Sequence, residues 1–461
     1  MLNKSFLQKV SKFIALHQLM QRDRKYIVAL SGGADSVTLA LALKELGYTI
    51  EAAHCNFHLR GEESNRDELF CQKFCNDNGI ALHTTHFDTD GFARLRKISI
   101  EMAARHLRYT YFNQLATDVD ASAICVAHHQ DDSVETVLLN LIRGTGLHGL
   151  TGIKPINGNI VRPLLCVTRH EIEAALYEAG QEYVTDSTNL VDDVVRNKIR
   201  LDILPLMKEI NPSVSNSIAA TAARVAEAAA ALDTMVESTA RIAETRHGGS
   251  THISIPAIMA EPASSYILFG LLKDYNFTPS QIGQIHSSMT AEPGRIFLSS
   301  THRLLIDRNH LVIEPKEETA LRPIVIPECG LYVIRNGMKI RVEKISRGNG
   351  FSIPTADKRC CMADAAKITF PLTVRPAAPG DRFKPFGMNG SKLVSDYLTD
   401  RKFNLFDKQR QLIMTDAEGH TVWLVGLRPD ERTRITGQTT EAIKITFIAD
   451  NTATQQDCQP S

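Results

Sequence analysis

The chain has 461 residues, enough for two or three domains, and 43% of them are apolar, so it can bury sizeable cores. Its 52 Lys and Arg residues balance its 52 Asp and Glu residues, so any surface for nucleic acid must be local. No window approaches the roughly 18 apolar residues of a membrane span. The nine scattered cysteines indicate a reducing cytoplasm rather than a disulfide framework, and we therefore expect a cytoplasmic protein.

The first two elements are an amphipathic helix and a buried strand. Phe6, Val10 and Ile14 recur at helical spacing, without the continuous apolar run of a signal peptide. Residues 26–30 then form an apolar strand that leads into Ser-Gly-Gly-Ala-Asp-Ser at residues 31–36 and a helix that ends at Gly47.

The loop at residues 31–36 has the properties of an anion site. Gly32 and Gly33 permit positive φ and close backbone approach, so successive N–H groups can converge on a phosphate at a helix N-terminus. Asp35 would repel a bare phosphate, so its presence predicts a Mg²⁺ ion between carboxylate and polyphosphate. The spacing is neither that of a Walker loop nor G-x-G-x-x-G. The alternative is an ordinary glycine-containing turn.

Strands and helices alternate from residue 26 to about residue 190, with strands predicted at residues 26–30, 50–56, 81–87 and 123–127. This order is the signature of a Rossmann-like doubly wound parallel sheet in an α/β domain. Ligands of such sheets bind outside the carboxyl ends of the strands. We therefore expect the loop at 31–36 and the segments that follow the second and fourth strands to share one crevice.

The segment at residues 128–136, HHQDDSVET, places two acids at the start of a helix. Asp132 and Glu135 are three residues apart and share a helical face. Paired carboxylates at this position can bind Mg²⁺, hold an ammonium group or accept a proton from an attacking amine. The alternative is helix capping by Asp131 or Asp132, with His128 and His129 as satisfied polar residues. A zinc site lacks a third neutral ligand at suitable spacing.

Later elements have clear local signals. Thr168 and Glu171 form a capping box at the start of a helix that Gly180 ends. An alanine-rich helix follows the break at Asn211-Pro212 and covers about residues 213–246, and a turn is predicted at Asn336-Gly337. From residue 368 the pattern becomes β-like.

The loop at residues 31–36 resembles the PP-loop of the ATP pyrophosphatases, and the conjunction of motifs around it resembles the tRNA(Ile)-lysidine synthetase family. The similarity covers residues 26–210 and about 370–435. Ser133 is a mild departure, since the family often has Gln there. The segments that carry the resemblance are HHQDDSVET, LIRGTGLHGLTG, VRPLL, HCNFHLRGEES, EMAARHLRY, DSTN…RNKIR and PGDRFKPFGMNGSKLVSDYLTDRK.

The resemblance implies a ligase that forms a C–N bond between lysine and the 2-position of the wobble cytidine in the CAU anticodon of tRNA(Ile). ATP first adenylates the cytidine, and attack by free L-lysine then gives lysidine, AMP and pyrophosphate. Because the amine of lysine has a pKa of ~10.4 in water, it arrives protonated and needs an anionic partner. We expect Asp132 and Glu135 to bind it and accept its proton, with their division of labour left open.

The resemblance also implies the remaining site residues. Arg105 is expected to contact ATP or the transition state, His54 to be a core or supporting histidine, and Arg60 to order the loop across the crevice. Mg²⁺ is expected on Asp35. Arg196, Asn197 and Arg200 are expected either to bind the tRNA backbone or to close over the adenylate, and each alone could be a surface charge. The predicted ATP ligands are Ser31, Gly32, Gly33, Ala34, Asp35 and Ser36, and the predicted tRNA ligands are Arg196, Asn197, Arg200, Arg382, Lys384 and Lys392.

The last three of these lie in a basic region. Residues 375–410 contain eight Lys or Arg residues and only four Asp residues. Aromatic residues lie among them, and such side chains can stack on unpaired bases. Aromatic residues in a β-rich segment are more often core, so we expect most of the five to be buried. They are Phe383, Phe386, Tyr397, Phe403 and Phe406.

We predict four parts: a PP-loop catalytic domain (1–212), a helical linker and middle domain (213–345), a small α+β tRNA-binding domain (346–450) and a polar tail (451–461). The oligomeric state is open, and a homodimer is among the options.

Three other functions share parts of the pattern. A tRNA thiolase also adenylates a base but uses catalytic or cluster-binding cysteines, and the sequence has no C-x-x-C. An amidating ligase such as a GMP synthetase needs a glutamine-hydrolysing domain, of which the sequence gives no sign. The intact loop and acid pair count against a non-catalytic RNA-binding protein.

Overall fold

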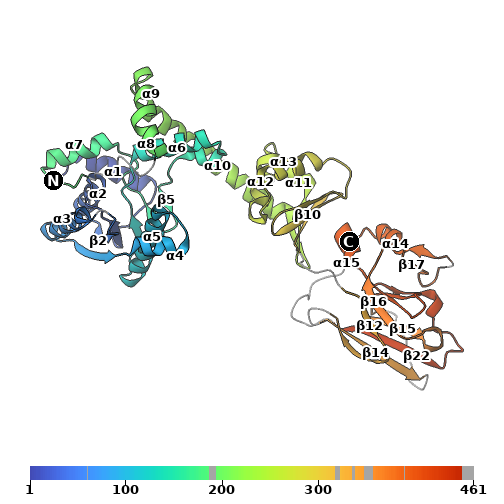
Figure 1. Cartoon of the computed structure of the whole chain (residues 1–461). Coiled ribbons are helices and arrows are strands. Elements are labelled where there is room, and N and C mark those ends of the chain that lie inside the picture. The colour runs from blue at the N-terminus through green and yellow to red at the C-terminus, as the bar shows by residue number, and fades with distance from the viewer. Residues whose placement is uncertain are drawn as a thin grey trace. The chain divides into compact units, whose positions relative to one another are not determined.

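The computed structural model describes residues 1–59, 61–185, 194–316, 322–334, 338–346, 357–388 and 390–448. The chain divides into two compact units, Met1–Ala231 and Leu232–Ser461 (Figure 1). The predictions for Arg60, for the Asn336-Gly337 turn, for the DSTN segment and for the tail at 451–461 lie outside the described residues. The division into domains at residues 212 and 345 stays a prediction.

The first unit contains the predicted parallel sheet. Its strand order is β3-β2-β1-β4-β6-β5, and every pairing is parallel except that of β5 with β6. The strands are β1 (Lys25–Ala29), β2 (Thr49–Asn56), β3 (Ala81–His86), β4 (Ala123–Cys125), β5 (Ile156–Asn157) and β6 (Ile160–Val161). The doubly wound α/β fold is therefore confirmed, with a short hairpin at one edge that the sequence patterns did not predict.

Alternate residues of β1 serve the two faces of this sheet. Tyr26 and Val28 belong to the larger core, which contains residues of α1, α2, α3 and α7, whereas Ile27 packs with Phe112 and Leu115 of α5. Burial on both faces explains why the strand reads as a continuous apolar run rather than an alternating one. The helices of the unit are α1 (Lys4–Leu16), α2 (Ala34–Glu45), α3 (Glu62–Asn78), α4 (Thr89–Arg96), α5 (Ile100–Asp118), α6 (Gln130–Arg143), α7 (Arg169–Ala179), α8 (Val194–Lys198) and α9 (Leu204–Ile210).

Several helix ends follow the sequence signals. The side chain of Thr168 accepts a hydrogen bond from the N–H of Glu171 at 3.2 Å, and that of Glu171 accepts one from the N–H of Thr168 at 2.8 Å. Gly180 ends α7 in the left-handed conformation. The alanine-rich helix α10 runs from Val214 to Ala243 and crosses the boundary between the two units. These two helices are confirmed.

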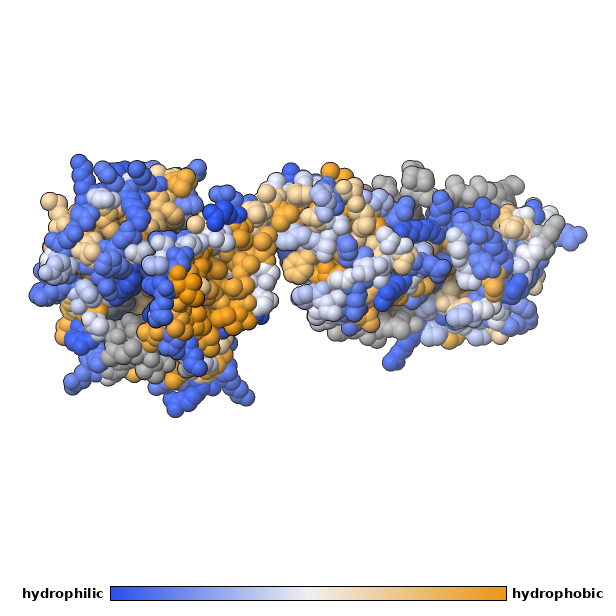
Figure 2. Space-filling view, turned by 90° about the horizontal axis from the view of Figure 1, so that it is seen from above, coloured by the Kyte–Doolittle hydropathy of each residue, from blue (hydrophilic) through white to orange (hydrophobic). Residues whose placement is uncertain are grey.

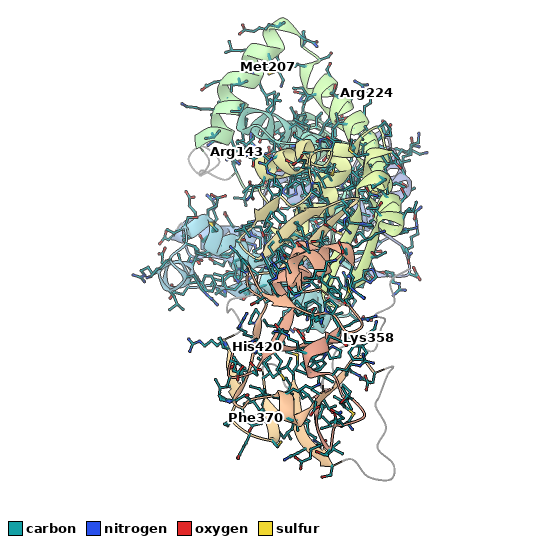
Figure 3. All side chains as sticks on the ribbon, turned by 90° about the vertical axis from the view of Figure 1, so that its right-hand side faces the viewer. Arg143, Met207, Arg224, Lys358, Phe370 and His420 are labelled. Atoms are coloured by element: carbon teal, nitrogen blue, oxygen red, sulfur yellow. The ribbon has the colours of Figure 1, made fainter. Side chains whose placement is uncertain are left out.

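The surface of the first unit carries a broad apolar area (Figure 2). Five exposed apolar side chains lie on α6, on α9 and on the single π-helical turn Ile199–Ile203 that precedes α9, namely Leu141, Ile142, Leu201, Leu206 and Ile210. Met207 of α9 and Arg224 of α10 are labelled in Figure 3. Among the residues that the structure describes, no helix is long and apolar enough to cross a membrane.

The second unit consists of antiparallel sheets. The first has the order β7-β8-β11-β10-β9 and shares a core with α11 (Ile255–Met259), α12 (Ser264–Leu272) and α13 (Pro279–Ser288). Its strands are β7 (Glu244–His247), β8 (Ser250–Ser254), β9 (Ile296–Leu298), β10 (His302–Asp307) and β11 (His310–Pro315).

Two further sheets, β12-β16-β19-β20-β21 and β13-β14-β22-β15, enclose one core, against which Phe370 packs (Figure 3). The small pair β17 (Arg382–Phe383) and β18 (Lys392–Leu393) precedes α14 (Val394–Asp400) and α15 (Leu405–Arg410). The other strands are β12 (Ile324–Ile326), β13 (Gly330–Val333), β14 (Lys339–Ser346), β15 (Cys360–Asp364), β16 (Leu372–Pro376), β19 (Leu412–Thr415), β20 (Thr421–Leu424), β21 (Arg428–Pro429) and β22 (Glu441–Ile448).

The aromatic residues of the basic region are mostly internal, as predicted. Phe383, Tyr397 and Phe406 are buried and Phe403 is half-buried. Phe386 is 40% exposed, with the guanidinium of Arg434 5.2 Å from its ring centroid. Most of these rings thus belong to the core, and Phe386 is the most exposed of the five.

Candidate active site

A cavity of about 500 Å³ opens at the carboxyl ends of β1, β2 and β4. The three segments that the sequence placed at one crevice all contribute to its wall, which confirms their convergence. The polar lining residues include Ser31, Asp35, Ser36, His54, Asn56, Arg105, Arg108, His128 and Asp132. Asp35 and Asp132, which are 97 positions apart in the sequence, therefore face one space.

The loop after β1 is held open by its own hydrogen bonds. The hydroxyl of Ser36 accepts a hydrogen bond from the N–H of Ser31 at 3.2 Å and donates one to the carbonyl of Gly33 at 3.0 Å. Gly32 has φ of +86°, and a Cβ there would lie 3.3 Å from Sγ of Cys71. Gly33 has φ of −73° and is the N-cap of α2. The N–H of Gly33 donates to Oγ of Ser31 at 3.5 Å. The first N–H groups of a helix have no acceptor within the helix, so those of α2 can bind an anion.

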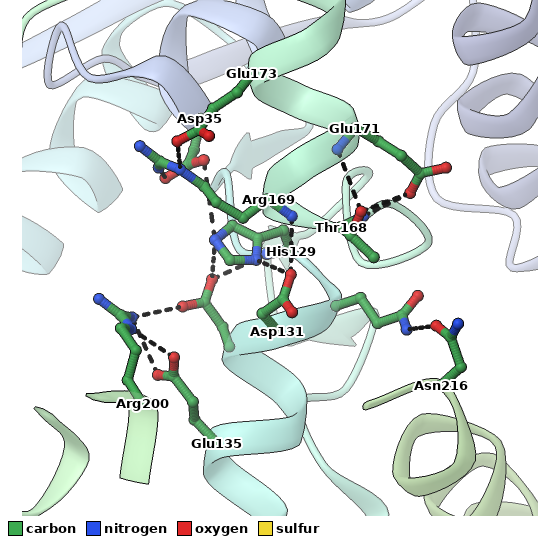
Figure 4. Close-up of polar contacts among 12 residues, drawn as sticks. Asp35, His129, Asp131, Glu135, Thr168, Arg169, Glu171, Glu173, Arg200 and Asn216 are labelled. Atoms are coloured by element: carbon green, nitrogen blue, oxygen red, sulfur yellow. Dashed lines mark hydrogen bonds and ion pairs between the residues drawn. The ribbon is translucent and has the colours of Figure 1, made fainter. Parts of the chain in front are cut away.

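Asp35 lies in the first turn of α2 and has two unequal oxygens. Its Oδ2 accepts a hydrogen bond from Nη1 of Arg169 at 2.6 Å (Figure 4). Its Oδ1 is buried, has no hydrogen-bond partner among the described residues and lies 3.9 Å from Nε2 of His129. Burial raises the pKa of Asp35, and the charges of His129 and Arg169 oppose that shift. A buried oxygen without a partner beside a phosphate-binding loop fits a ligand of Mg²⁺.

His129 stands among three carboxylates at the start of α6. Its backbone N–H donates to Asp132 at 3.0 Å, and its ring nitrogens lie 3.6 Å from Asp131 and 3.5 Å from Asp132. Burial lowers the pKa of His129, but the acids Asp131, Asp132 and Asp35 outweigh burial and raise it overall. The three carboxylates around His129 thus favour its imidazolium form.

Glu135 lies one turn further along α6 in a different environment. It is only 2% exposed, and its carboxylate accepts hydrogen bonds from Nε of Arg200 at 2.6 Å, Nε of Arg196 at 2.9 Å and Nη2 of Arg200 at 3.1 Å. It is absent from the cavity wall, whereas Asp132 is part of it. The structure thus brings Asp35 and Asp132 together and places Glu135 behind them as the counter-ion of two arginines.

Packing on α6 fixes the position of these arginines. Ile199 and Leu204 are buried against Val134 and Leu138 of α6. The chain from α8 to α9 therefore runs along the helix that carries Glu135. Both Arg196 and Arg200 also lie 3.9 Å from Oδ1 of Asp132.

Two histidines of the cavity wall are held in defined states. Nδ1 of His54 lies 2.9 Å from the carbonyl of Leu30, and burial lowers its pKa, as suits a supporting residue. Nδ1 of His128 accepts a hydrogen bond from Nε of Arg162 at 3.0 Å. Burial lowers the pKa of His128 to about 4. His128 is thus neutral at pH 7, with its proton on Nε2.

Arg105 and Arg108 line the cavity from α5. The guanidinium of Arg105 lies 5.1 Å from the ring centroid of Tyr109, and that of Arg108 lies 5.2 Å from that of Phe57. Stacking on an aromatic face restricts a guanidinium while leaving its N–H groups free to donate at the edge. This geometry is compatible with the contact predicted for Arg105, and its role stays a prediction.

The predicted tRNA ligands fall into two groups. Arg196, Asn197 and Arg200 belong to the first unit, and the first and third of them are bound to Glu135. In the second unit, Nε of Arg382 donates to Oγ of Ser391 at 3.0 Å. Lys392 pairs with Asp400, and the backbone of Lys384 donates to Asp430. These roles also stay predictions.

The sequence patterns did not single out Arg162 or Arg169 as site residues. Arg162 lies within VRPLL and Arg169 directly after a helix cap, so each reads locally as a surface charge. Their partners His128 and Asp35 are 34 and 134 positions away. Only the folded sheet brings these pairs together.

Two protein-family models and two curated relatives match this chain. Residues 2–207 match the model of a PP-loop domain, and residues 246–316 match that of a TilS substrate binding domain. The chain is 46% identical to tRNA(Ile)-lysidine synthase of Bacteroides thetaiotaomicron over 95% of this chain and 98% of that protein. It is 44% identical to tRNA(Ile)-lysidine synthase of Parabacteroides distasonis over 96% of this chain and all of that protein.

Among solved structures, the U34-tRNA thiolase NcsA from Methanococcus maripaludis aligns with a TM-score of 0.42 and 20% identity, over 49% of this chain and 79% of that chain. The nearly full-length identity to the two curated relatives, together with the PP-loop and the acids that face its cavity, decides the family. The chain belongs to the tRNA(Ile)-lysidine synthase family.

Proposed function

We propose that the chain joins free L-lysine to the 2-position of the wobble cytidine of tRNA(Ile) with a CAU anticodon, using ATP and giving lysidine, AMP and diphosphate. One observation carries the proposal: Asp35, beside the PP-loop, and Asp132, at the start of α6, face the same cavity. A site that activates a base and then delivers an amine to it needs an anion cradle and an acid opposite each other. The names of the curated relatives support the substrate.

The first step activates the base. The 2-carbonyl oxygen of cytosine is a poor leaving group, so it attacks the α-phosphorus of ATP, and the P–O bond to the diphosphate breaks. The Gly32–Gly33 backbone and the N-terminus of α2 bind the departing diphosphate. Asp35 would hold Mg²⁺, and the ion would supply positive charge to the phosphate oxygens. Arg105 donates to the nucleotide from the other wall.

The second step replaces AMP by lysine. Asp132 binds the ammonium group and takes its proton, and the neutral amine attacks the activated ring carbon as AMP leaves. Glu135 does not contact lysine itself in this proposal. Its carboxylate orients Arg196 and Arg200 beside Asp132. His128 holds its proton on Nε2 and donates rather than accepts there.

A thiolase reaction suits the cavity less well. Cys55 lines the cavity, and burial raises its pKa to about 12. Its sulfur therefore stays a thiol at neutral pH, whereas sulfur transfer needs a thiolate.

The test supplies purified protein with Mg-ATP, labelled lysine and CAU-anticodon tRNA(Ile). We expect ATP-dependent label in the tRNA, with AMP and diphosphate released in equal amounts. Label that does not depend on ATP, or AMP formation without label in the tRNA, would contradict the proposal.

A matched pair of variants separates chemistry from RNA binding. Asp35→Ala should abolish labelling and leave tRNA binding nearly unchanged, as measured by filter binding. Asp90→Ala removes an acid from the first turn of α4, where it is exposed, and should behave as wild type. Loss of tRNA binding in Asp35→Ala would remove Asp35 from its assigned role.

A further inference from the structure

Arg169, the first residue of α7, bridges both halves of the site (Figure 4). Its backbone N–H donates to Oδ2 of Asp131 at 2.8 Å, and its Nη1 donates to Oδ2 of Asp35 at 2.6 Å. Its Nε donates to Oε1 of Glu173, one turn along α7, at 2.7 Å. The backbone anchor fixes where the side chain begins, and Glu173 fixes its direction.

The guanidinium lies where the metal and the phosphates are expected. Asp35 belongs to the first turn of α2, next to the Gly32–Gly33 backbone that we expect to bind an anion. Arg169 neutralises one oxygen of this carboxylate, while the other oxygen has no hydrogen-bond partner among the described residues and lies 3.9 Å from Nε2 of His129. If Asp35 held Mg²⁺, the carboxylate would no longer need the positive charge of Arg169.

The guanidinium then has a free edge. Its side chain is 39% exposed, and its Nη2 donates to none of the residues that the structure describes. Arginine presents five N–H donors in a planar fork that matches phosphate oxygens. With Nε still on Glu173, Nη1 and Nη2 can turn from Asp35 to an anion in the adjacent loop.

We propose that Arg169 is a diphosphate-binding residue, which leaves Asp35 when the metal-bound polyphosphate enters and then holds the departing diphosphate during adenylation. This inference rests on the proposed function for its timing, but the binding of diphosphate itself does not depend on the identity of the base. The other reading is that Arg169 only ties α7 to α2.

Asp131 also links Arg169 to His129. The carboxylate that receives the backbone N–H of Arg169 also lies 3.6 Å from Nδ1 of His129. The hydrogen bond from Arg169 and the ion pair with His129 thus let Asp131 connect the start of α7 to the residue before α6. Arg169 is therefore attached at one end to the diphosphate cradle and at the other to the acid cluster.

The test measures binding of Mg²⁺-loaded inorganic diphosphate by calorimetry to the full chain, without tRNA or lysine. Loss of a charge-assisted contact predicts that Arg169→Gln weakens diphosphate binding about 10-fold or more. Arg169→Lys keeps the charge but not the planar fork of donors, so its affinity for diphosphate should lie between that of the wild type and that of Arg169→Gln. Lysine affinity, measured on the same samples, should not change.

Lys9→Gln is the matched control, because Lys9 also pairs with an acid of α7, Glu171, at 2.6 Å, away from the loop. It should bind diphosphate as wild type does. If Arg169→Gln binds diphosphate with wild-type affinity, or if Lys9→Gln weakens binding equally, the inference is wrong and Arg169 is structural. Diphosphate binding that depends on Arg169 in a protein that forms no lysidine would uphold the inference and refute the function.

Discussion

Replacing Asp132 by asparagine tests whether the two acids of α6, Asp132 and Glu135, have different roles. Asp132 lines the cavity with 15% of its side chain exposed, whereas Glu135 is 2% exposed and bound by two arginines. If Asp132 binds the ammonium group of lysine, its neutral isostere should weaken lysine binding and leave the protein folded. The asparagine oxygen can still accept the N–H of His129, so the helix start is retained.

The expected size follows from the kind of bond that is lost. A hydrogen bond between charged groups contributes about 1.5–3 kcal/mol, which corresponds to a roughly 10- to 150-fold higher KM for lysine. The unfolding free energy should fall by less than about 1 kcal/mol. In Glu135→Gln, loss of a buried counter-ion should instead lower it by about 1–3 kcal/mol, less than for a fully buried pair because both arginines are about one-third exposed.

The assay measures lysidine formation against lysine concentration at saturating ATP and tRNA, and diphosphate release without lysine. Asp132→Asn should raise the KM for lysine and leave diphosphate release unchanged, because adenylation precedes the amine. Denaturant unfolding of both variants completes the comparison. The reasoning fails if Glu135→Gln raises the KM for lysine at unchanged stability while Asp132→Asn does not.

Three further outcomes follow from burial, titration and backbone conformation. Glu314→Gln removes a buried acid that Arg303 and Arg410 bind at 2.9 and 2.7 Å, and should lower the unfolding free energy by about 2–4 kcal/mol. The control is Glu441→Gln, because the side chain of Glu441 is 45% exposed and lies 2.7 Å from Lys344; its loss should cost less than about 1 kcal/mol, and equal thermal shifts for the two variants would contradict this. Between pH 6.5 and about 4 the unfolded chain binds more protons at His128 than the folded chain, so its contribution to stability falls as pH falls. His128→Gln should flatten that slope in denaturant unfolding, and an unchanged slope would refute it. Gly32→Ala forces a side chain into φ of +86° and should weaken ATP binding in calorimetry, whereas wild-type affinity would exclude the cradle role.

The parallel sheet was predictable because its signals are local. A strand buried on both faces must be apolar throughout, and β1 and β4 show this directly. The strands β5 and β6, which form the hairpin at one end of the sheet, have two residues each, too few for any period to be recognised. In the second unit, the antiparallel partners of β22 are β14 and β15, which lie far apart from it in sequence, so no spacing rule could pair them.

The site was predictable only where its chemistry is contiguous. The PP-loop works through adjacent backbone groups and therefore appears as one motif, and the acids of α6 appear as a helical pair. The difference between Asp132 and Glu135 could not be predicted, because it depends on arginines more than 60 positions away. Helical spacing places two side chains on one face but does not say which of them the fold covers.

The sequence patterns could not show which arginines pair with the residues of the site. A buried carboxylate needs a counter-ion close to it, but that counter-ion can come from any segment of the chain. Arg162, Arg169, Arg196 and Arg200 come from loops and helices that follow the last long strand of the sheet, and each meets an earlier residue of the cavity wall or the acid cluster. Within the first unit, segments up to and including α6 therefore provide the acids and the loop at residues 31–36, and later segments provide the four arginines that pair with residues of these segments.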